Sequence, residues 1–347
     1  MPSTPRCTAT RVRGNGRAAG HACISEPTVA SALDPRSRAG RCGAATVPAT
    51  AASPIFSPSS IAGLASIPDA GLPEPRGVVS VRALPQAPRS VPTAAVVEGT
   101  FTPRRIDNAL TAFVVEHPRA RFVVDPGVCL DAERRAIAQL PAVLRVAVRP
   151  PAATVATVDS LREHDPRPLD FALPTHAHWD HVCGLLDLPG LPVHMHRVER
   201  RWIMSGRVAP VGGVRDALRE RPVVEYDLDG PPVLTFTASH DLFGDGTVVL
   251  VDLSGHTPGS IGMLAHTRRG WVLLAGDAAW HHLQIDKIRQ KASYPGGFAD
   301  DDRDLTFRTL HRLHLARTTV TVVPAHDRAA AQRLRAEDEP AAVANDG

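Results

Sequence analysis

Four side chains that can bind metal ions fall within six residues of this sequence. The stretch 173–184 reads LPTHAHWDHVCG and contains His176, His178, Asp180 and His181, just after an apolar run that predicts a buried strand. Imidazole and carboxylate are the usual side-chain ligands for zinc and its neighbours in the divalent series. Four groups this close in sequence point in different directions, so they cannot all bind one tetrahedral ion. We interpret them as two pairs that serve two ions.

Three more candidate ligands occur later in the chain. His256 lies in the turn SGHTPGS (254–260), Asp277 ends the run LLAGD (273–277), and His326 lies in VVPAHD (322–327). Each follows an apolar run, so each is predicted where a strand gives way to a loop, which is where function is usually placed on a rigid scaffold. A lone histidine is more often structural than a ligand, but this many polar groups at strand ends indicates a shared role.

These motifs, in this order, resemble those of the metallo-β-lactamase superfamily. The resemblance covers roughly Val96 to Ala330 and rests on HxHxDH, a Gly-His-Thr-Pro-Gly turn, Gly-Asp and a late histidine. It implies an α/β (α+β) fold, namely a four-layer αβ/βα sandwich. In this fold two mixed β-sheets face each other, helices cover the outside, and the metals bind at one edge.

The resemblance also implies a role for each candidate. The first metal site would be formed by His176, His178 and His256, and the second by Asp180, His181 and His326. Asp277 would bridge them, and the two aspartates, Asp180 and Asp277, are the expected catalytic residues. The cofactor is then two divalent metal ions, with Zn²⁺ expected.

The chemistry of such a site agrees with this assignment. Three imidazoles leave one ion an open position, and two cations about 3.5–4 Å apart need an anionic bridge and can share a hydroxide. Binding to a metal lowers the pKa of water toward about 7, so hydroxide is available at neutral pH. The bridging hydroxide would attack an acyl carbon while a metal polarises the carbonyl group. The expected reaction is metal-assisted hydrolysis.

Several superfamily branches fit less well than others. The intact Asp180–His181 pair argues against one-iron persulfide dioxygenases, and Asp277 argues against true β-lactamases. The remaining classes are lactonases, glyoxalase II-like thioesterases, and phosphodiesterase or RNase Z-like hydrolases. About 20 residues follow His326, too few for the added helical domain that binds glutathione. A lactone or related ester, including N-acyl-homoserine lactones, is the expected small-molecule substrate. A non-catalytic metal-binding scaffold is disfavoured because all seven ligand positions are filled.

One position departs from the lactonase pattern. Several homoserine lactonases carry a tyrosine three residues after the bridging aspartate, where this chain has Trp280. An indole cannot act as a proton donor to the leaving group, although it can pack an acyl chain. His281, His282 or Tyr294 are the alternative donors. Trp179 is assigned with Trp280 to substrate binding, with a plain packing role for Trp179 left open.

The composition excludes some partners. The net charge is +3, with 39 basic and 36 acidic residues, so no field indicates nucleic acid or an RNase Z-like tRNA-gripping arm. No run approaches the ~20 apolar residues of a membrane span. A cytoplasmic protein is therefore expected, and a homodimer remains open. Five cysteines at irregular spacing imply no disulfide framework. Cys183, beside the metal motif, is interpreted as a small buried filler, and the only lysines are Lys287 and Lys291.

The chain divides into three parts by composition. Residues 1–92 are rich in Ala, Pro and Arg and poor in acidic groups, so they are predicted to be a disordered tail. A targeting segment and a start codon assigned too far upstream are alternative accounts of this tail. Residues 93–332 form the predicted hydrolase domain, and residues 333–347 a C-terminal tail.

Apolar patterning places the elements of the domain. A hairpin is predicted from Leu110–Glu116 and Arg121–Asp125, and Asp125 is either a turn residue or a hydrogen-bond partner of a ligand histidine. His194 and His196 alternate along a short strand and are excluded as ligands. Helices are predicted at 131–139, 154–164, 197–204 and 304–315, and near Asp180. Further strands are predicted at 169–173, 193–196, 223–226, 233–237, 247–253, 261–265, 271–274 and 320–323.

Overall fold

The computed structural model describes residues 66–84, 88–150, 153–205, 213–293 and 296–338. All of the described residues belong to one compact unit, residues 56–347. Within the described ranges, no helix has the length and apolar character needed to cross a membrane.

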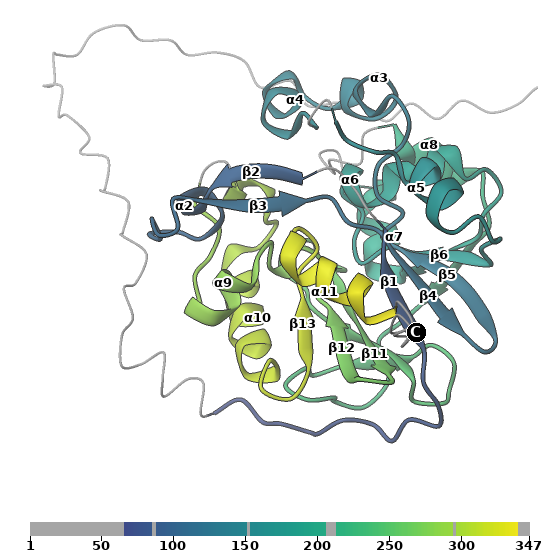
Figure 1. Ribbon diagram of the computed structural model, residues 1–347, viewed down its shortest axis with the longest axis vertical. Coiled ribbons are helices and arrows are strands. Elements are labelled where there is room, and N and C mark those ends of the chain that lie inside the picture. Colours follow the sequence, from purple (N-terminus) through teal and green to yellow (C-terminus); the bar gives the residue numbers. More distant parts are fainter. Residues whose placement is uncertain (1–65, 85–87, 151–152, 206–212, 294–295, 339–347) are drawn as a thin grey trace, which may run out of the picture. The chain divides into compact units, whose positions relative to one another are not determined.

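A mixed six-stranded sheet forms one half of this unit (Figure 1). Its strands lie in the order β1 (Ser80–Ala83), β4 (Phe113–His117), β5 (Ala120–Val124), β6 (Phe171–Leu173), β7 (Val193–His196) and β8 (Val223–Tyr226). β4 is antiparallel to both of its neighbours, β1 and β5, and β5 to β8 are parallel. The β4–β5 pair, in which Phe113 lies opposite Val124, is the hairpin predicted from the sequence.

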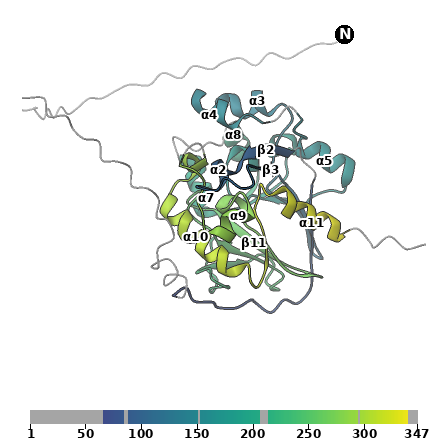
Figure 2. The same cartoon turned by 60° about the vertical axis from the view of Figure 1, so that its left-hand side comes forward.

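A mixed five-stranded sheet forms the other half. Its order is β13 (Thr321–Val323), β12 (Gly270–Leu274), β11 (Ile261–Thr267), β10 (Val248–Asp252) and β9 (Ser239–Asp241). Only β12 and β13 are parallel neighbours. A separate antiparallel ribbon joins β2 (Pro88–Pro92) to β3 (Arg105–Ala109), beside α2 (Thr93–Val96) (Figures 1 and 2).

Alternation along the strands builds the four layers. Phe122 and Val124 of β5 pack into a core that also holds Leu250 and Met263 of the second sheet, whereas Val123 points into a different core with the outer helices. The helical elements on that side are α3 (Ala132–Arg135), η1 (Ile137–Gln139), α4 (Ala142–Val148), α5 (Thr157–His164), α6 (Trp179–Val182), η2 (Cys183–Asp187), α7 (Arg197–Ser205) and α8 (Val214–Arg219).

The second sheet has its own outer layer. Its strands contribute Leu264 and Leu273 to a third core, which holds Leu310 and Leu313 of α10 (Arg303–Ala316) and Ile285 of α9 (His282–Lys287). The remaining short helices are η3 (Gly276–Ala278) and η4 (Gly296–Ala299). The order helix, sheet, sheet, helix confirms the predicted αβ/βα sandwich.

Both predicted tail boundaries are wrong in part. Strand β1 pairs with β4, and Val79, Val81 and Ala83 are buried, so the ordered domain begins before residue 93. The nearby prolines hid the alternating apolar pattern of this strand. At the other end, α11 (Arg328–Asp338) continues past residue 332 and buries Leu334 between the sheets. Residues 1–65 and 339–347 lie outside the described residues.

The predicted strand at 233–237 is also wrong. Val233 and Phe236 form only an isolated bridge, and Leu234 has a φ of 49°. β-Branched and aromatic residues favour strands, but here the main chains of Val233 and Phe236 hydrogen-bond to each other and close a tight turn. Their side chains pack on the third core, so their apolar character reflects burial rather than strand pairing.

Candidate metal centre

The candidate ligands meet because four strands end at one edge of the sandwich. In the second sheet, β10, β12 and β13 all run in the same direction, since β11 is antiparallel to both β10 and β12 and β13 is parallel to β12. Their carboxyl ends deliver His256, Asp277 and His326. The end of β6 joins this edge through a hydrogen bond of 2.9 Å from Ile261 N to Thr175 O.

One group of ligand atoms consists of three imidazoles and a carboxylate, from His176, His178, His256 and Asp277. His178 Nδ1 lies 3.1 Å from His176 Nε2 and 2.8 Å from His256 Nε2. Asp277 Oδ2 lies 3.3 Å from His256 Nε2 and 4.0 Å from His176 Nε2. All four residues are buried. These atoms face a common point, as the ligands of one ion must.

A second group of ligand atoms comes from Asp180, His181 and His326. Asp180 Oδ2 lies 4.0 Å from His181 Nε2 and 3.8 Å from His326 Nε2. Asp277 Oδ1 lies 3.2 Å from His181 Nε2 and 3.0 Å from His326 Nε2. The two oxygens of Asp277 therefore face different groups, which is the arrangement of a bridging carboxylate.

The donor set fits divalent cations. Among the described residues, Asp277 Oδ1 and His181 Nε2 are buried side-chain atoms without a hydrogen-bond partner. Leaving buried polar atoms unpaired is costly, so such atoms call for a ligand. Neutral imidazole and ionised carboxylate are what Zn²⁺ and similar ions bind. The geometry brings together all seven predicted ligands.

Electrostatics favour the ligand forms of the first group. Burial lowers the pKa of His176 and of His178 well below the usual value, with neighbouring imidazoles adding to the effect, so both rings are neutral. Burial pushes the pKa of Asp277 upward, but His326 and His181 outweigh it and hold that pKa well below its ordinary value. In the second group, Asp277 and Asp125 overcome the effect of burial and raise the pKa of His181. The acidic groups thus create a site that attracts positive charge.

Hydrogen bonds fix the orientation of the ligand rings. His181 Nδ1 donates to Asp125 Oδ2 at 2.9 Å, which confirms the hydrogen-bonding alternative for Asp125. Asp125 also accepts from Thr175, at 2.6 Å from its N and 2.9 Å from its Oγ1. His326 Nδ1 donates to Ala109 O at 3.0 Å. Such partners determine which ring nitrogen faces a metal.

Glu199, which the sequence did not single out, joins the two ligand loops. This buried residue of α7 accepts from Ala177 N at 2.7 Å, Thr257 Oγ1 at 2.8 Å and Gly259 N at 3.1 Å. A Cβ on Gly259 would lie 2.3 Å from Glu199 N, so the turn needs glycine at this position. Burial raises the pKa of Glu199 to about 7. An acidic residue on an otherwise Arg-rich helix was the available signal.

The two tryptophans assigned to substrate differ in position. Trp280 Nε1 donates to Asp277 Oδ2 at 2.7 Å, and its ring meets that of His326 edge-on at 5.7 Å. Trp280 therefore lies against both ligand groups. Trp179 is 5% exposed and packs in the core beneath the outer helices, which favours the packing role that the sequence left open.

The other predicted residues lie as follows. His281 and His282 lie with Asp327 in a separate group, where His282 Nδ1 donates to Asp327 Oδ2 at 2.6 Å. His194 and His196 join none of the candidate metal groups among the described residues. Cys183 is a buried filler, as predicted. Tyr294 lies outside the described residues.

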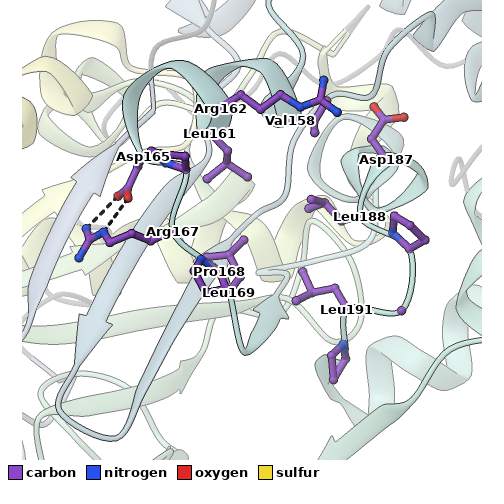
Figure 3. Close-up of a pocket in the computed structure, with 14 residues that line it drawn as sticks. Val158, Leu161, Arg162, Asp165, Arg167, Pro168, Leu169, Asp187, Leu188 and Leu191 are labelled. Atoms are coloured by element: carbon purple, nitrogen blue, oxygen red, sulfur yellow. Dashed lines mark hydrogen bonds and ion pairs between the residues drawn. The ribbon is translucent and has the colours of Figure 1, made fainter.

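A surface pocket lies at the opposite edge of the first sheet (Figure 3). It is formed by the chain before β6 and the chain before β7, so it lies at the amino ends of these strands, away from the ligand groups. Asp165 in this pocket pairs with Arg167 at 3.0 Å and with Arg121 at 2.6 Å. The pocket belongs to neither of the two ligand groups that share Asp277.

Comparison with known protein families and proteins finds matches to the part of the chain that carries the ligand groups. The profile of the metallo-beta-lactamase superfamily matches residues 107–326. A probable metallo-hydrolase of Mycobacterium tuberculosis is 34% identical over 121 residues, covering 32% of this chain. The match spans only 37% of that relative's own length. The N-acyl homoserine lactonase AttM of Azorhizobium caulinodans is 26% identical over 221 residues, which are 62% of this chain and 80% of that protein.

Solved structures show the same fold. A quorum-quenching N-acyl homoserine lactone lactonase matches with a TM-score of 0.54 at 15% identity, covering 73% of this chain and 94% of that chain. An N-acyl homoserine lactone hydrolase with the product N-hexanoyl-L-homoserine at its catalytic metal centre matches with a TM-score of 0.53 at 14% identity. That match covers 74% of this chain and 95% of the other. At such identities the likeness concerns the fold alone.

Proposed function

This chain belongs to the metallo-beta-lactamase superfamily, and from that premise we propose that it is a hydrolase of lactones or related esters that uses two divalent metal ions. The observation that carries the proposal is the carboxylate of Asp277. One of its oxygens faces His256, and the other faces His181 and His326. A carboxylate shared in this way is what a dinuclear hydrolytic site requires.

We assign the ligands by the group to which each belongs. The first ion would be held by His176, His178 and His256, the second by Asp180, His181 and His326, and both by Asp277. Zn²⁺ is the expected metal. When bound, the two ions supply an acidified water as nucleophile and polarise the substrate carbonyl.

The protein's own groups would orient the substrate. The side chain of Asp180 is 17% exposed and that of Asp277 is 4% exposed, so Asp180 is the acid that a substrate can reach. Asp180 Oδ2 faces His181 and His326 as a ligand atom, so we assign proton transfer to the other carboxyl oxygen of Asp180 and the positioning of the metals to Asp277. Trp280 is half-buried beside His326 and offers an apolar face for an acyl chain. N-acyl-homoserine lactones combine such a chain with a lactone ring and are the favoured substrates.

A panel of substrates tests the proposal. The zinc-loaded full chain would be assayed by proton release with acyl-homoserine lactones of short and long chain, simple γ- and δ-lactones, a glutathione thioester and a phosphodiester. We expect the lactones to be opened, and we expect Asp277→Asn to abolish turnover. Hydrolysis of only the thioester or only the phosphodiester would replace the lactone assignment with one of the alternative classes. No turnover of any substrate by metal-loaded protein would contradict the proposal.

The remaining expectations stay predictions. They are a cytoplasmic location, the absence of a nucleic-acid partner, and a homodimer as one of the alternative oligomeric states.

A further inference from the structure

Lysine is rare in this chain, and one of its two lysines is buried beside the ligand groups. Of the 39 basic residues, only Lys287 and Lys291 are lysines. Lys287 is exposed on α9, whereas Lys291 is 1% exposed. A buried ammonium group is costly unless it is paired and hydrogen-bonded. A buried lysine at this position therefore needs an acidic partner and hydrogen-bond acceptors around its ammonium group.

Lys291 has these partners, and all of them belong to the site. Its Nζ donates to Asp300 Oδ1 at 2.6 Å and to the main-chain oxygen of Asp277 at 2.9 Å. It lies 3.3 Å from His256 Nδ1 and 5.0 Å from the centre of the Trp280 ring. One ammonium group thus contacts the bridging residue, a ligand histidine and the aromatic residue beside them.

Asp300 transmits this contact to His256. Its Oδ1 accepts from His256 Nδ1 at 2.7 Å, so the same oxygen receives both the imidazole and the ammonium. The main chain of His256 is held by the same segment, because Asp301 N donates to His256 O at 3.0 Å. A carboxylate that accepts from the far nitrogen of a ligand histidine fixes how the ring faces a metal.

The size and shape of its charged group distinguish a lysine from an arginine at position 291. A lysine presents a compact charge with three donors, whereas an arginine presents a wide planar fork. Most basic positions of this chain are arginine, and Lys291 is one of two exceptions. Arg303 lies next to it but donates to the main-chain oxygen of Lys291, at 3.1 Å, and so supports its backbone.

We propose that Lys291 is a positioning residue that holds Asp300, the Asp277 main chain and Trp280 together, and so fixes His256 and Asp277 as ligands of the first ion. This inference rests on the proposed two-ion site. Lys291 is buried, so we assign it no contact with the substrate. Its effect reaches the chemistry through the orientation of one imidazole and one carboxylate.

Metal affinity tests this role without relying on activity. The full-length wild type, Lys291→Met, Asp300→Asn and the double variant would be titrated with Co²⁺, following the visible absorption of each bound ion and competition with a chelator. Lys287→Met is the matched control. We expect Lys291→Met and Asp300→Asn each to weaken binding of one of the two ions about 10- to 100-fold and to leave the other ion bound. The double variant should be little weaker than the poorer single variant, because both act through one contact.

Two other roles predict different results. If Lys291 acted only through its charge, its removal would favour a cation and tighten binding. If it only stabilised the fold, Lys291→Met would lower the unfolding temperature of the metal-free protein and leave both affinities unchanged. Either result overturns the proposal. Should Lys291→Met fail to fold, Asp300→Asn decides alone, and unchanged affinity in that variant overturns it. A wild type that binds no Co²⁺ overturns both this inference and the proposed function.

Discussion

Asp125 and Asp277 approach the same imidazole from opposite sides. Asp125 accepts from Nδ1 of His181, and Asp277 lies 3.2 Å from Nε2. The first contact orients the ring, and the second places its free nitrogen at the second ligand group. The backbone of Asp125 has a φ of 48°, a conformation in which Asp and Asn are the favoured residues other than glycine.

Asp125→Asn should therefore weaken the second ion without disturbing the backbone. The two carboxylate oxygens of Asp125 accept from three donors, because Oδ1 accepts from Thr175 N and Oδ2 accepts from Thr175 Oγ1 and His181 Nδ1. Asparagine replaces one of these oxygens with an NH2 group, which is itself a donor, so at least one of the three donors loses its acceptor. We expect the affinity for one ion to fall about 10- to 100-fold. Competition titration with a chelator measures this, and Asp170→Asn, at an exposed turn, is a suitable control. Unchanged affinity would show that Asp125 serves the turn alone.

At the scale of single residues, the sequence predicted the metal ligands better than the residues that hold those ligands in place. The ligands share short motifs, so their types and spacing were visible. Glu199 and Lys291 were not, because their partners lie far away in sequence: Glu199 contacts Thr257, and Lys291 contacts His256. Whether a charged side chain is buried depends on packing between distant elements, which no local pattern contains. The turn that carries Asp125 was an exception, since it directly follows a predicted strand.

Helix α7 holds the two ligand loops together through Glu199. The carboxyl group of Glu199 accepts from both loops and is 2% exposed. Burial raises its pKa from 4.5 to about 7, so in the folded protein it releases its proton at higher pH than in the unfolded chain. Between these values the unfolded chain binds fewer protons, and stability falls as pH rises.

Glu199→Gln should remove this dependence, because an amide does not titrate. We expect the free energy of unfolding of the metal-free wild type to decrease relative to the variant from about pH 4.5 to about pH 7, by up to about 1.4 kcal/mol per pH unit, and to level off above. Urea unfolding of both proteins across this range measures the difference. Parallel curves would mean that the three donors keep Glu199 ionised in the folded protein.

The strand that delivers the ligand motif depends on packing between the sheets. Phe122 of β5 is fully buried and stacks on Phe171 of β6, with ring centres 4.6 Å apart. Phe122→Ala should lower the free energy of unfolding by about 3–5 kcal/mol, since it leaves a cavity at the centre of the sandwich. Arg119→Ala, in the exposed turn between β4 and β5, is the control. A loss below 1 kcal/mol in the denaturant midpoint analysis would contradict the assigned core.

Elements with a clear apolar pattern were predicted, and elements without one were not. The β4–β5 hairpin, β10 to β12 and α10 all follow regular patterns of buried residues. Strands β1 and β2 lie among prolines, and β9 has only three residues. Such strands exist because a neighbouring strand offers them hydrogen bonds, as β4 does for β1. That partner cannot be read from the strand itself.

At the scale of the molecule, the ligands come from both halves of the sandwich. His176, His178, Asp180 and His181 follow the first sheet, whereas His256, Asp277 and His326 follow the second. Bound metal would join the two sheets at their shared edge. Metal binding should therefore stabilise the whole sandwich rather than a single loop.

Removal of metal should lower the unfolding temperature in a single transition. A ligand at a concentration of 100 times its Kd stabilises a folded protein by about 2.7 kcal/mol per site. We expect chelation to reverse this gain and to abolish hydrolysis, and added Zn²⁺ to restore both. Scanning calorimetry of loaded, chelated and reloaded protein measures the change. Equal unfolding temperatures in all three samples would contradict a metal shared between the sheets.

We propose that Asp277 bridges two metal ions, and the number of ions that the protein retains is the most direct test of this role. Wild-type protein and Asp277→Asn would be loaded with Zn²⁺, dialysed together against metal-free buffer and measured by elemental analysis. We expect about two equivalents of Zn²⁺ per chain in the wild type and fewer in the variant, because an amide cannot supply the bridging charge. One equivalent or none in the wild type, or two in both proteins, would contradict it.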